Sequence, residues 1–219
     1  MGVREKFQYD LQELKDKLVE LGEYALNALN RAIVALEQQN IDDALRIMEE
    51  DAKVDKLEEE INDFAILLIA KQQPVAIDLR RIMVAVKIAS DLERIADFAV
   101  NIAKSTIRIG NEPLIKPIDH IKKMHQIASS MIELTMKAFE EEDIVKAKQV
   151  AEMDDKVDSL YGQTIQELLS YTHQMPEKIE QITQLSFICR YLERTADHVT
   201  NITESIFYLV KGRHYDLNN

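Results

Sequence analysis

The sequence predicts an all-α protein made of two tandem, pseudo-symmetric three-helix bundles, with six long antiparallel helices. Three observations lead to this prediction. The 219 residues include only 5 Gly and 4 Pro, so the chain has few points at which it can turn. Apolar residues recur with helical spacing along most of the chain, and no window shows the alternation of a β-strand. Segments of the second half also repeat segments of the first half in the same order.

Helix-breaking residues separate the predicted helices. The first half turns at Asn40 and at Pro74, and its last helix stops at Gly110. In the second half, Pro176 separates the last two helices. The predicted helices cover residues 7–38, 42–71, 76–108, 118–140, 143–172 and 178–211.

Each predicted helix carries an apolar stripe that must be buried against neighbouring helices. Because the connections are short, consecutive helices are expected to be antiparallel neighbours, which gives one bundle in residues 1–110 and another in residues 111–219. Gly22 and Gly162 lie inside helices, where we expect close packing, and Cys189 is expected to pack on an apolar flank. Five methionines are expected to fill the core: Met83, Met124, Met131, Met136 and Met153.

The internal repeat is clearest in the second and third helices of each half. In the second helix, DAKVDKL (51–57) matches DDKVDSL (154–160) at an offset of 103 residues. In the third helix, DLERIADFAVNI (91–102) matches YLERTADHVTNI (191–202) at an offset of 100 residues. The offset changes in the proline-containing connection, where insertions and deletions are tolerated.

Composition and charge exclude several classes of protein. The formal net charge of −12 argues against binding to nucleic acid, which requires a basic face. The longest apolar run in the middle of the chain, residues 64–70, is too short for a membrane span. The single cysteine excludes a disulfide framework and a cysteine-based zinc site. No apolar signal-peptide block stands at the start of the sequence, so we expect a cytoplasmic protein.

Carboxylates recur at helical spacing beside the apolar stripes. Glu93, Asp97 and Asn101 follow one another at intervals of four residues, and Asp51 and Asp55 do the same in the preceding helix. Neighbouring carboxylates at this spacing repel each other by a few tenths of a kcal/mol. The second half repeats both lines with Asp154, Asp158, Glu193, Asp197 and Asn201.

Spacing alone leaves two interpretations of these carboxylates open. Oxygen-rich clusters suit hard cations or iron, and helices two and three of each bundle could share such a site. Alternatively, the lines are solvated faces with ordinary ion pairs, such as Arg94 with Asp97 and Arg194 with Asp197. A purely structural helical adaptor is compatible with the second interpretation.

An enzyme is less well supported. No histidine has a glutamate three residues before it, as the helical di-iron centres require, and no phosphate-binding glycine loop is present. His198 corresponds to Phe98 in the first half, so it does not belong to a repeated ligand set. We interpret His198 as a partly buried polar residue.

The doubled motif Leu-Glu-Arg-x-Ala-Asp-x-x-x-Asn, together with Asp-x-x-x-Asp in the preceding helix, resembles the PhoU family. The resemblance extends over about residues 7–211 and is strongest in QPVAIDLRRIMVAVKIASDLERIADFAVNIA (73–103). It implies a negative regulator of the phosphate regulon and of phosphate uptake, and not an enzyme. Such a regulator contacts PstB, the ATPase subunit of the phosphate ABC transporter, and the sensor kinase PhoR. The resemblance also implies a homodimer that meets the membrane only through its partners.

The resemblance further implies that the carboxylate motifs bind metal, with iron, zinc, manganese or magnesium as candidates. Carried over to this sequence, one site consists of Asp51, Asp55, Glu93 and Asp97, with Asn101 as an outer member. The other site consists of Asp154, Asp158, Glu193 and Asp197, with Asn201 as an outer member. Because Glu58 corresponds to Tyr161, the second site is expected to hold fewer carboxylates.

Overall fold

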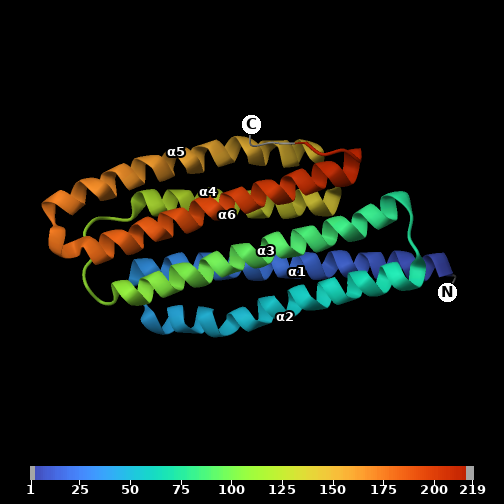
Figure 1. Ribbon diagram of the computed structural model, residues 1–219, viewed down its shortest axis with the longest axis horizontal. Coiled ribbons are helices and arrows are strands. Elements are labelled where there is room, and N and C mark those ends of the chain that lie inside the picture. The colour runs from blue at the N-terminus through green and yellow to red at the C-terminus, as the bar shows by residue number, and fades with distance from the viewer. Residues whose placement is uncertain (1–2, 216–219) are drawn as a thin grey trace.

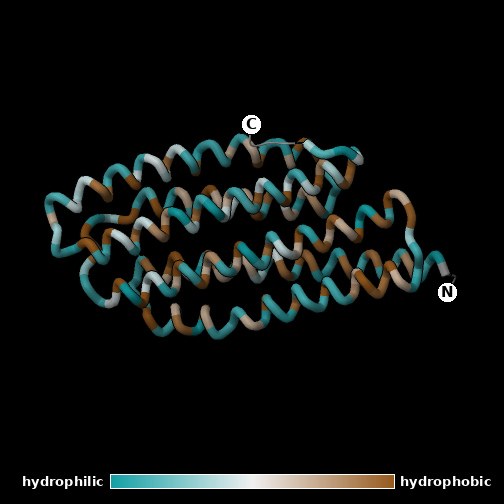
Figure 2. Tube along the Cα trace, viewed as in Figure 1, coloured by the Kyte–Doolittle hydropathy of each residue, from teal (hydrophilic) through white to brown (hydrophobic). Residues whose placement is uncertain are grey.

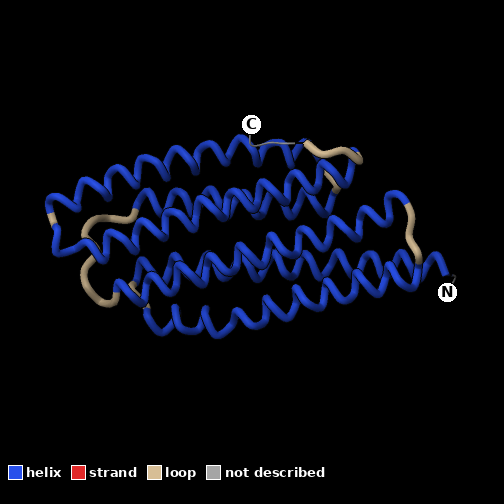
Figure 3. Tube along the Cα trace, viewed as in Figure 1, coloured by secondary structure: helices blue, strands red, loops and turns tan. Residues whose placement is uncertain are grey.

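The computed structural model describes residues 3–215, and every long regular element in this range is an α-helix (Figure 3). Both predicted breaks at Asn40 and Gly110 are confirmed, and Pro176 begins a short 3₁₀ turn between the last two helices. The elements are α1 (Val3–Gln38), α2 (Ile41–Gln72), α3 (Ala76–Ile109), α4 (Asp119–Glu141), α5 (Ile144–Gln174), the 3₁₀ turn (Pro176–Lys178) and α6 (Ile179–Lys211).

The six helices form two three-helix bundles that lie side by side along their long axes (Figure 1). Helices α1, α2 and α3 pack on one another in the first bundle, and α4, α5 and α6 do so in the second. The most extensive contact in the molecule joins α3 to α6, and α1 also packs on α4. The predicted fold is therefore confirmed, whereas the division into residues 1–110 and 111–219 as separate domains stays a prediction.

Side-chain caps begin α2 and α5, and a glycine with a positive φ ends α3. The side chain of Asn40 accepts a hydrogen bond from the backbone N–H of Asp43 at 3.0 Å, which satisfies a free donor at the start of α2. Asp143 caps α5 in the same way by accepting from Val145 at 2.8 Å. Gly110 ends α3 with a φ of 69°, a conformation that glycine adopts without steric cost.

The burial pattern repeats between the halves and confirms the internal duplication. Figure 2 shows hydrophobic residues recurring along each helix between hydrophilic ones. Fully buried Leu18 and Leu29 of α1 correspond to buried Ile121 and Ile132 of α4, at the same offset of 103 residues that relates α2 to α5. Between α3 and α6, buried positions coincide at an offset of 100: Ile82 with Ile182, Ile88 with Ile188, Leu92 with Leu192, Ala96 with Ala196, and Ile102 with Ile202.

Two equivalent contacts at the α3–α6 interface have different chemistry. Asp91 of α3 is buried, and its Oδ1 lies 2.9 Å from Nδ1 of His198 on α6. The pseudo-symmetric positions are Tyr191 and Phe98, whose rings stack with centroids 6.1 Å apart. The prediction that His198 is a partly buried polar residue is confirmed, since 15% of its side chain is exposed.

Several packing predictions can be compared with the structure. Cys189 is fully buried, and a Cβ on Gly22 would approach the Met136 side chain to 3.0 Å, so both packing predictions are confirmed. The prediction for Gly162 is wrong, because a Cβ there would meet no atom within 4 Å. Met83 is also not a core residue: 52% of it is exposed. Met124, Met131 and Met136 are buried, and Met153 packs against the core from a partly buried position.

The connection between α2 and α3 carries a concentration of exposed apolar side chains. We call this surface the α2–α3 tip; it consists of Ile66, Leu67, Val75, Ile77, Leu79 and Met83. The corresponding end of the second bundle exposes Leu169, Ile179 and Phe187. Met83 lies at the edge of this surface, where it lines a cavity together with Ser205 and Tyr208 of α6. None of the helices described is both long and apolar enough to cross a membrane.

Candidate functional site

The predicted carboxylates of the first half come together where α2 packs on α3. Asp51 and Asp55 extend from α2, and Glu93 and Asp97 extend from α3. The charge of Asp97 acts on Asp51, and the charges of Asp55 and Glu58 act on Glu93. The first carboxylate cluster, as we call it, consists of Asp51, Asp55, Glu58, Glu93 and Asp97. Asn101 lies one helical turn beyond Asp97 and is half-buried.

Burial and mutual repulsion perturb the first carboxylate cluster. Partial burial raises the pKa of Asp51, and the charges of Asp55 and Asp97 raise it further, while Lys104 opposes them. Burial is also the main cause of the raised pKa of Glu93, followed by repulsion from Asp97. The cluster is therefore an energetically unfavourable arrangement of like charges that a bound cation would relieve.

The second half repeats this arrangement between α5 and α6. Asp154 is buried, and burial together with the charges of Asp158 and Asp197 raises its pKa to about 7. The pKa values of Asp158 and Glu193 are raised as well, first by burial and then by repulsion from Asp197. Asn201 is half-buried one turn beyond Asp197.

The second carboxylate cluster consists of Asp154, Asp155, Asp158, Glu193 and Asp197. Asp155 belongs to it because its charge acts on both Asp154 and Asp158. The position equivalent to Asp155 is Ala52, whereas the position equivalent to Glu58 is Tyr161. The expected shortage of carboxylates in the second half is therefore offset by Asp155, and both clusters hold five.

The ion pairs predicted from spacing are present in both halves. Arg94 lies 2.9 Å from Asp97 and 3.5 Å from Glu93, and Arg194 lies 3.5 Å from Asp197. The Arg94 side chain is 56% exposed, so water screens its charge and the pairs contribute little stability. These arginines therefore neutralise the clusters only in part, and the interpretation as ordinary surface ion pairs accounts for part of the pattern.

Arg190 is a neighbour of the second cluster that the sequence interpretation missed. Its guanidinium donates to Oε1 of Glu193, one turn further along α6, and lies 5.9 Å from the centre of the Tyr161 ring on α5. The spacing of three residues between Arg190 and Glu193 was a signal that could have revealed the pair. The contact with Tyr161 joins two helices and has no signal in the sequence.

The donor chemistry of both clusters fits a hard cation. In the second cluster, Oδ1 of Asp154 and Oε2 of Glu193 are buried and have no hydrogen-bond partner among the described residues. Carboxylate oxygens that lack a donor in a buried position are suitable ligands for such a cation. Across residues 3–215, no three or more Asp, Glu, His or Cys side chains lie close enough together to hold a metal ion. The side chains would have to turn toward a bound ion.

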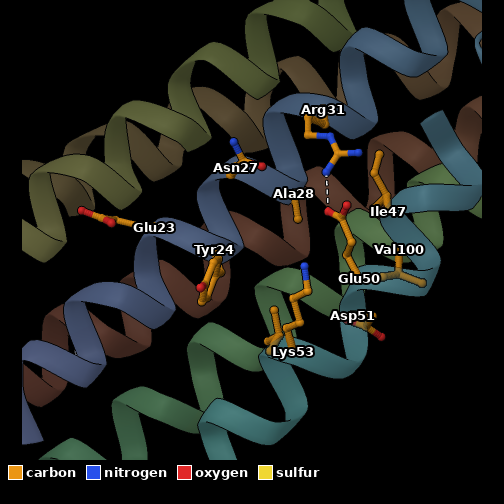
Figure 4. A pocket seen from close by; sticks show the side chains of 11 residues that line it. Glu23, Tyr24, Asn27, Ala28, Arg31, Ile47, Glu50, Asp51, Lys53 and Val100 are labelled. Carbon is orange, nitrogen blue, oxygen red and sulfur yellow. Dashed lines mark hydrogen bonds and ion pairs between the residues drawn. The ribbon is translucent and has the colours of Figure 1, made fainter.

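A groove with both charged and apolar lining residues lies beside the first cluster, between α1 and α2. It encloses about 400 Å³ and reaches Asp51 at one edge. Figure 4 shows Arg31 of α1 pairing across it with Glu50 of α2, above Lys53. Arg31 also donates to Asp43 at 2.7 Å. The groove was not foreseen from the sequence, because its lining combines residues of α1 and α2 with Val100 of α3.

Comparison with known proteins identifies the relatives of this chain. The family model for the PhoU domain matches residues 18–106 and again residues 121–206, which is one match in each half. A PhoU homolog from Clostridium acetobutylicum, described as a phosphate-specific transport system accessory protein, is 41% identical over 217 residues and covers 99% of both chains. The Escherichia coli protein of the same description is 32% identical over 213 residues, covering 96% of this chain and 87% of its own.

Two solved structures that resemble this chain are also PhoU proteins. The crystal structure of PhoU from Pseudomonas aeruginosa superposes with a TM-score of 0.91 at 29% identity, covering 94% of this chain and all of that one. The phosphate transport system regulatory protein PhoU from Streptococcus pneumoniae gives a TM-score of 0.90 at 28% identity, covering 96% and 99% of the two chains. The doubled helical motif, the two bundles and these relatives together show that the chain belongs to the PhoU family.

Proposed function

We propose that this chain is a negative regulator of the phosphate regulon and of phosphate uptake. The observation that carries the proposal is the match of both halves to the PhoU domain, in a chain whose relatives are described as accessory proteins of phosphate-specific transport. Family membership and coverage of nearly the whole chain support the transfer of this role. The regulator acts when phosphate is plentiful.

The regulator acts as an adaptor and not as an enzyme. Its partners in this proposal are PstB, the ATPase subunit of the phosphate transporter, and the sensor kinase PhoR, which it meets at the cytoplasmic side of the membrane. A rod of six packed helices suits this role because it presents extended rigid faces. The α2–α3 tip supports the proposal, since a group of exposed apolar side chains is typical of a protein contact surface. A homodimer is part of the same proposal.

Metal binding is a further part of the proposal. Asp51, Asp55, Glu93 and Asp97 would hold a cation in the first half, and their counterparts Asp154, Asp158, Glu193 and Asp197 would hold one in the second half. Iron, zinc, manganese and magnesium are all candidates, and a bound cation would supply positive charge between carboxylates that otherwise repel one another. The unpartnered oxygens of Asp154 and Glu193 favour this role.

Deletion of the gene, followed by a phosphatase reporter in high phosphate, tests the regulatory role. The deletion strain is expected to express the phosphatase despite abundant phosphate, and the wild-type chain supplied from a plasmid is expected to restore repression. Unchanged repression in the deletion strain would contradict the proposal and would favour a metal-handling or purely structural protein.

Charge reversal of the first cluster tests whether the carboxylates serve the partners. The double variant Glu93→Lys/Asp97→Lys is expected to lose binding to PstB or PhoR and to lose repression, because it inverts the charge of a partly exposed line of carboxylates. The matched control reverses two exposed acids on helices that carry neither cluster, Glu13 of α1 and Glu133 of α4. Intact partner binding and repression in the cluster variant would show that the carboxylates do not shape the partner surface.

A further inference from the structure

Apart from Asp155, which corresponds to Ala52, the two carboxylate clusters differ at two neighbouring positions, one on each helix of the pair. At the α6 position before the motif the second half has Arg190, whereas the first half has Ser90. On the facing helix, the second half has Tyr161 and the first half has Glu58. Each cluster holds five carboxylates. Where the second half has an arginine beside an aromatic ring, the first half has a serine hydroxyl and a glutamate.

Arg190 is held against the second cluster from both helices. Its guanidinium donates to Oε1 of Glu193 and lies over the Tyr161 ring, 5.9 Å from the centroid. A guanidinium over an aromatic face is attracted by the ring as well as by the carboxylate. The charge of Arg190 also opposes part of the rise in the pKa of Asp158, so Arg190 acts on the α5 side of the cluster as well.

The first cluster has no arginine at the position equivalent to Arg190. Glu93 is paired with Arg94, whose Nε lies 3.5 Å from it, but the counterpart Arg194 is also present in the second half. Ser90 is exposed and uncharged, and Glu58 occupies the position that corresponds to Tyr161. Oε1 of Glu58 accepts a hydrogen bond from Asn62 at 2.6 Å, and its charge acts on Glu93. The cation that acts on Asp51 is Lys104, two turns beyond Asp97 on α3, and its effect is smaller than those of burial and repulsion.

We propose that Arg190 is a built-in counter-ion of the second carboxylate cluster, and that it makes the first half the tighter site for a divalent cation. This inference rests on the proposal that the clusters bind cations. A divalent ion entering the second cluster meets the positive charge of Arg190 and competes with it for Glu193. The second cluster keeps the two unpartnered oxygens of Asp154 and Glu193, so its affinity is lowered and not abolished.

Titration of the metal-free protein with Mn²⁺ in a calorimeter tests this proposal in each half separately. In a Glu193→Gln/Asp197→Asn background only the first cluster is intact, and in a Glu93→Gln/Asp97→Asn background only the second is intact. We expect the first cluster to bind Mn²⁺ about three- to tenfold more tightly than the second, because one nearby positive charge at a partly exposed site has an effect of this size.

Reciprocal substitutions separate the arginine from other differences between the halves. Arg190→Ser is expected to tighten Mn²⁺ binding to the second cluster about three- to tenfold, and Ser90→Arg is expected to weaken binding to the first by a similar factor. Arg190→Lys retains the charge and is expected to leave the affinity close to that of the wild type. Arg108→Ser, which removes an exposed arginine near the end of α3, is the matched control.

Three results would overturn the proposal. These are tighter Mn²⁺ binding to the second cluster in the wild type, an unchanged affinity after Arg190→Ser in a variant with wild-type helicity and Tm, and no Mn²⁺ binding to either cluster in any variant. Because the readout is binding to purified protein, failure of this inference is distinguishable from failure of the regulatory role, which the phosphatase reporter measures.

Discussion

The two halves of the molecule share their framework and differ in how they carry negative charge. Buried positions of α3 and α6 coincide residue by residue, and the carboxylates occupy equivalent places. Yet the second cluster, in which Asp154 is buried, has Arg190 between Glu193 and Tyr161. In the first cluster, Asp51 is half-buried and a further glutamate, Glu58, acts on Glu93. After duplication, packing constrained the apolar stripes in both halves, while the edges of the stripes were free to diverge.

The largest expected effect comes from the shared core and tests whether the framework is equivalent in both halves. Leu92→Ala and Leu192→Ala each remove a fully buried side chain from the hydrophobic core, one on α3 and one at the equivalent position on α6. Each is expected to lower the free energy of unfolding by about 2–5 kcal/mol, through lost burial and the cavity left behind. Urea denaturation followed by circular dichroism measures both. A loss below about 1 kcal/mol in only one half would break the equivalence.

The next effect concerns Asp154 and the pH. Its pKa of about 7 in the folded protein lies above the ordinary value of 3.8, so folding disfavours the ionised carboxylate. This destabilisation is absent below about pH 4 and grows until about pH 7, where it amounts to roughly 4 kcal/mol at most. Asp154→Asn is therefore expected to remove part of the decline in stability over this range, measured in metal-free buffer.

Asp51→Asn is the matched variant in the first half. Its effect on the pH profile is expected to have the same sign and to be smaller, because Asp51 is less buried than Asp154. Excess Mn²⁺ is expected to reduce both effects, since a bound cation stabilises the ionised carboxylates. A pH profile that Asp154→Asn leaves unchanged would show that its carboxyl is not disfavoured by folding.

A smaller effect is expected at the two equivalent contacts across α3 and α6. Asp91→Ala leaves the buried Nδ1 of His198 without its partner, which is expected to cost about 1–3 kcal/mol. Tyr191→Phe, at the equivalent position, keeps the stacked ring pair and is expected to change stability by less than about 0.5 kcal/mol. Thermal unfolding measures the stability of both variants. Equal losses of stability would show that the Asp91–His198 contact contributes no more than the hydroxyl group of Tyr191.

The smallest effect distinguishes the two helical glycines. Gly162→Ala is expected to raise the free energy of unfolding by about 0.5–1 kcal/mol, because the added methyl group meets no atom and alanine favours the helix. Gly22→Ala is expected to gain less or to lose stability, because Met136 must move away. A larger gain at Gly22 than at Gly162 in chemical denaturation would contradict the packing described here.

Much of the fold was predictable because it depends on local patterns. Apolar spacing predicted the helices, and Asn40, Gly110 and Pro176 predicted their ends, since capping and chain breaking act within a few residues. The repeated motif also predicted which carboxylates lie together, because the same pairing of helices recurs in each half. The contact of Asp91 with His198 was not predictable, because 107 residues separate the two and only the crossing of α3 and α6 joins them.

Other misses have equally local physical causes. Periodicity places Met83 on an apolar face, but in the structure Met83 borders an open cavity beside Tyr208 and His214, so its exposure was not foreseen. Gly162 is compatible with close packing in sequence, yet its Cα faces open space. The groove beside Asp51 is lined by residues of α1 and α2, with Arg31 paired to Glu50 between them, a combination that no motif describes.

Elemental analysis of the purified protein tests the central claim that the two carboxylate clusters are cation sites of unequal strength. The wild type is compared with Glu93→Ala/Asp97→Ala and with Glu193→Ala/Asp197→Ala. The account predicts bound iron, zinc, manganese or magnesium in the wild type, a large loss when the first cluster is removed, and a smaller loss when the second is removed. Absence of metal from the wild type, even after reconstitution, would contradict it.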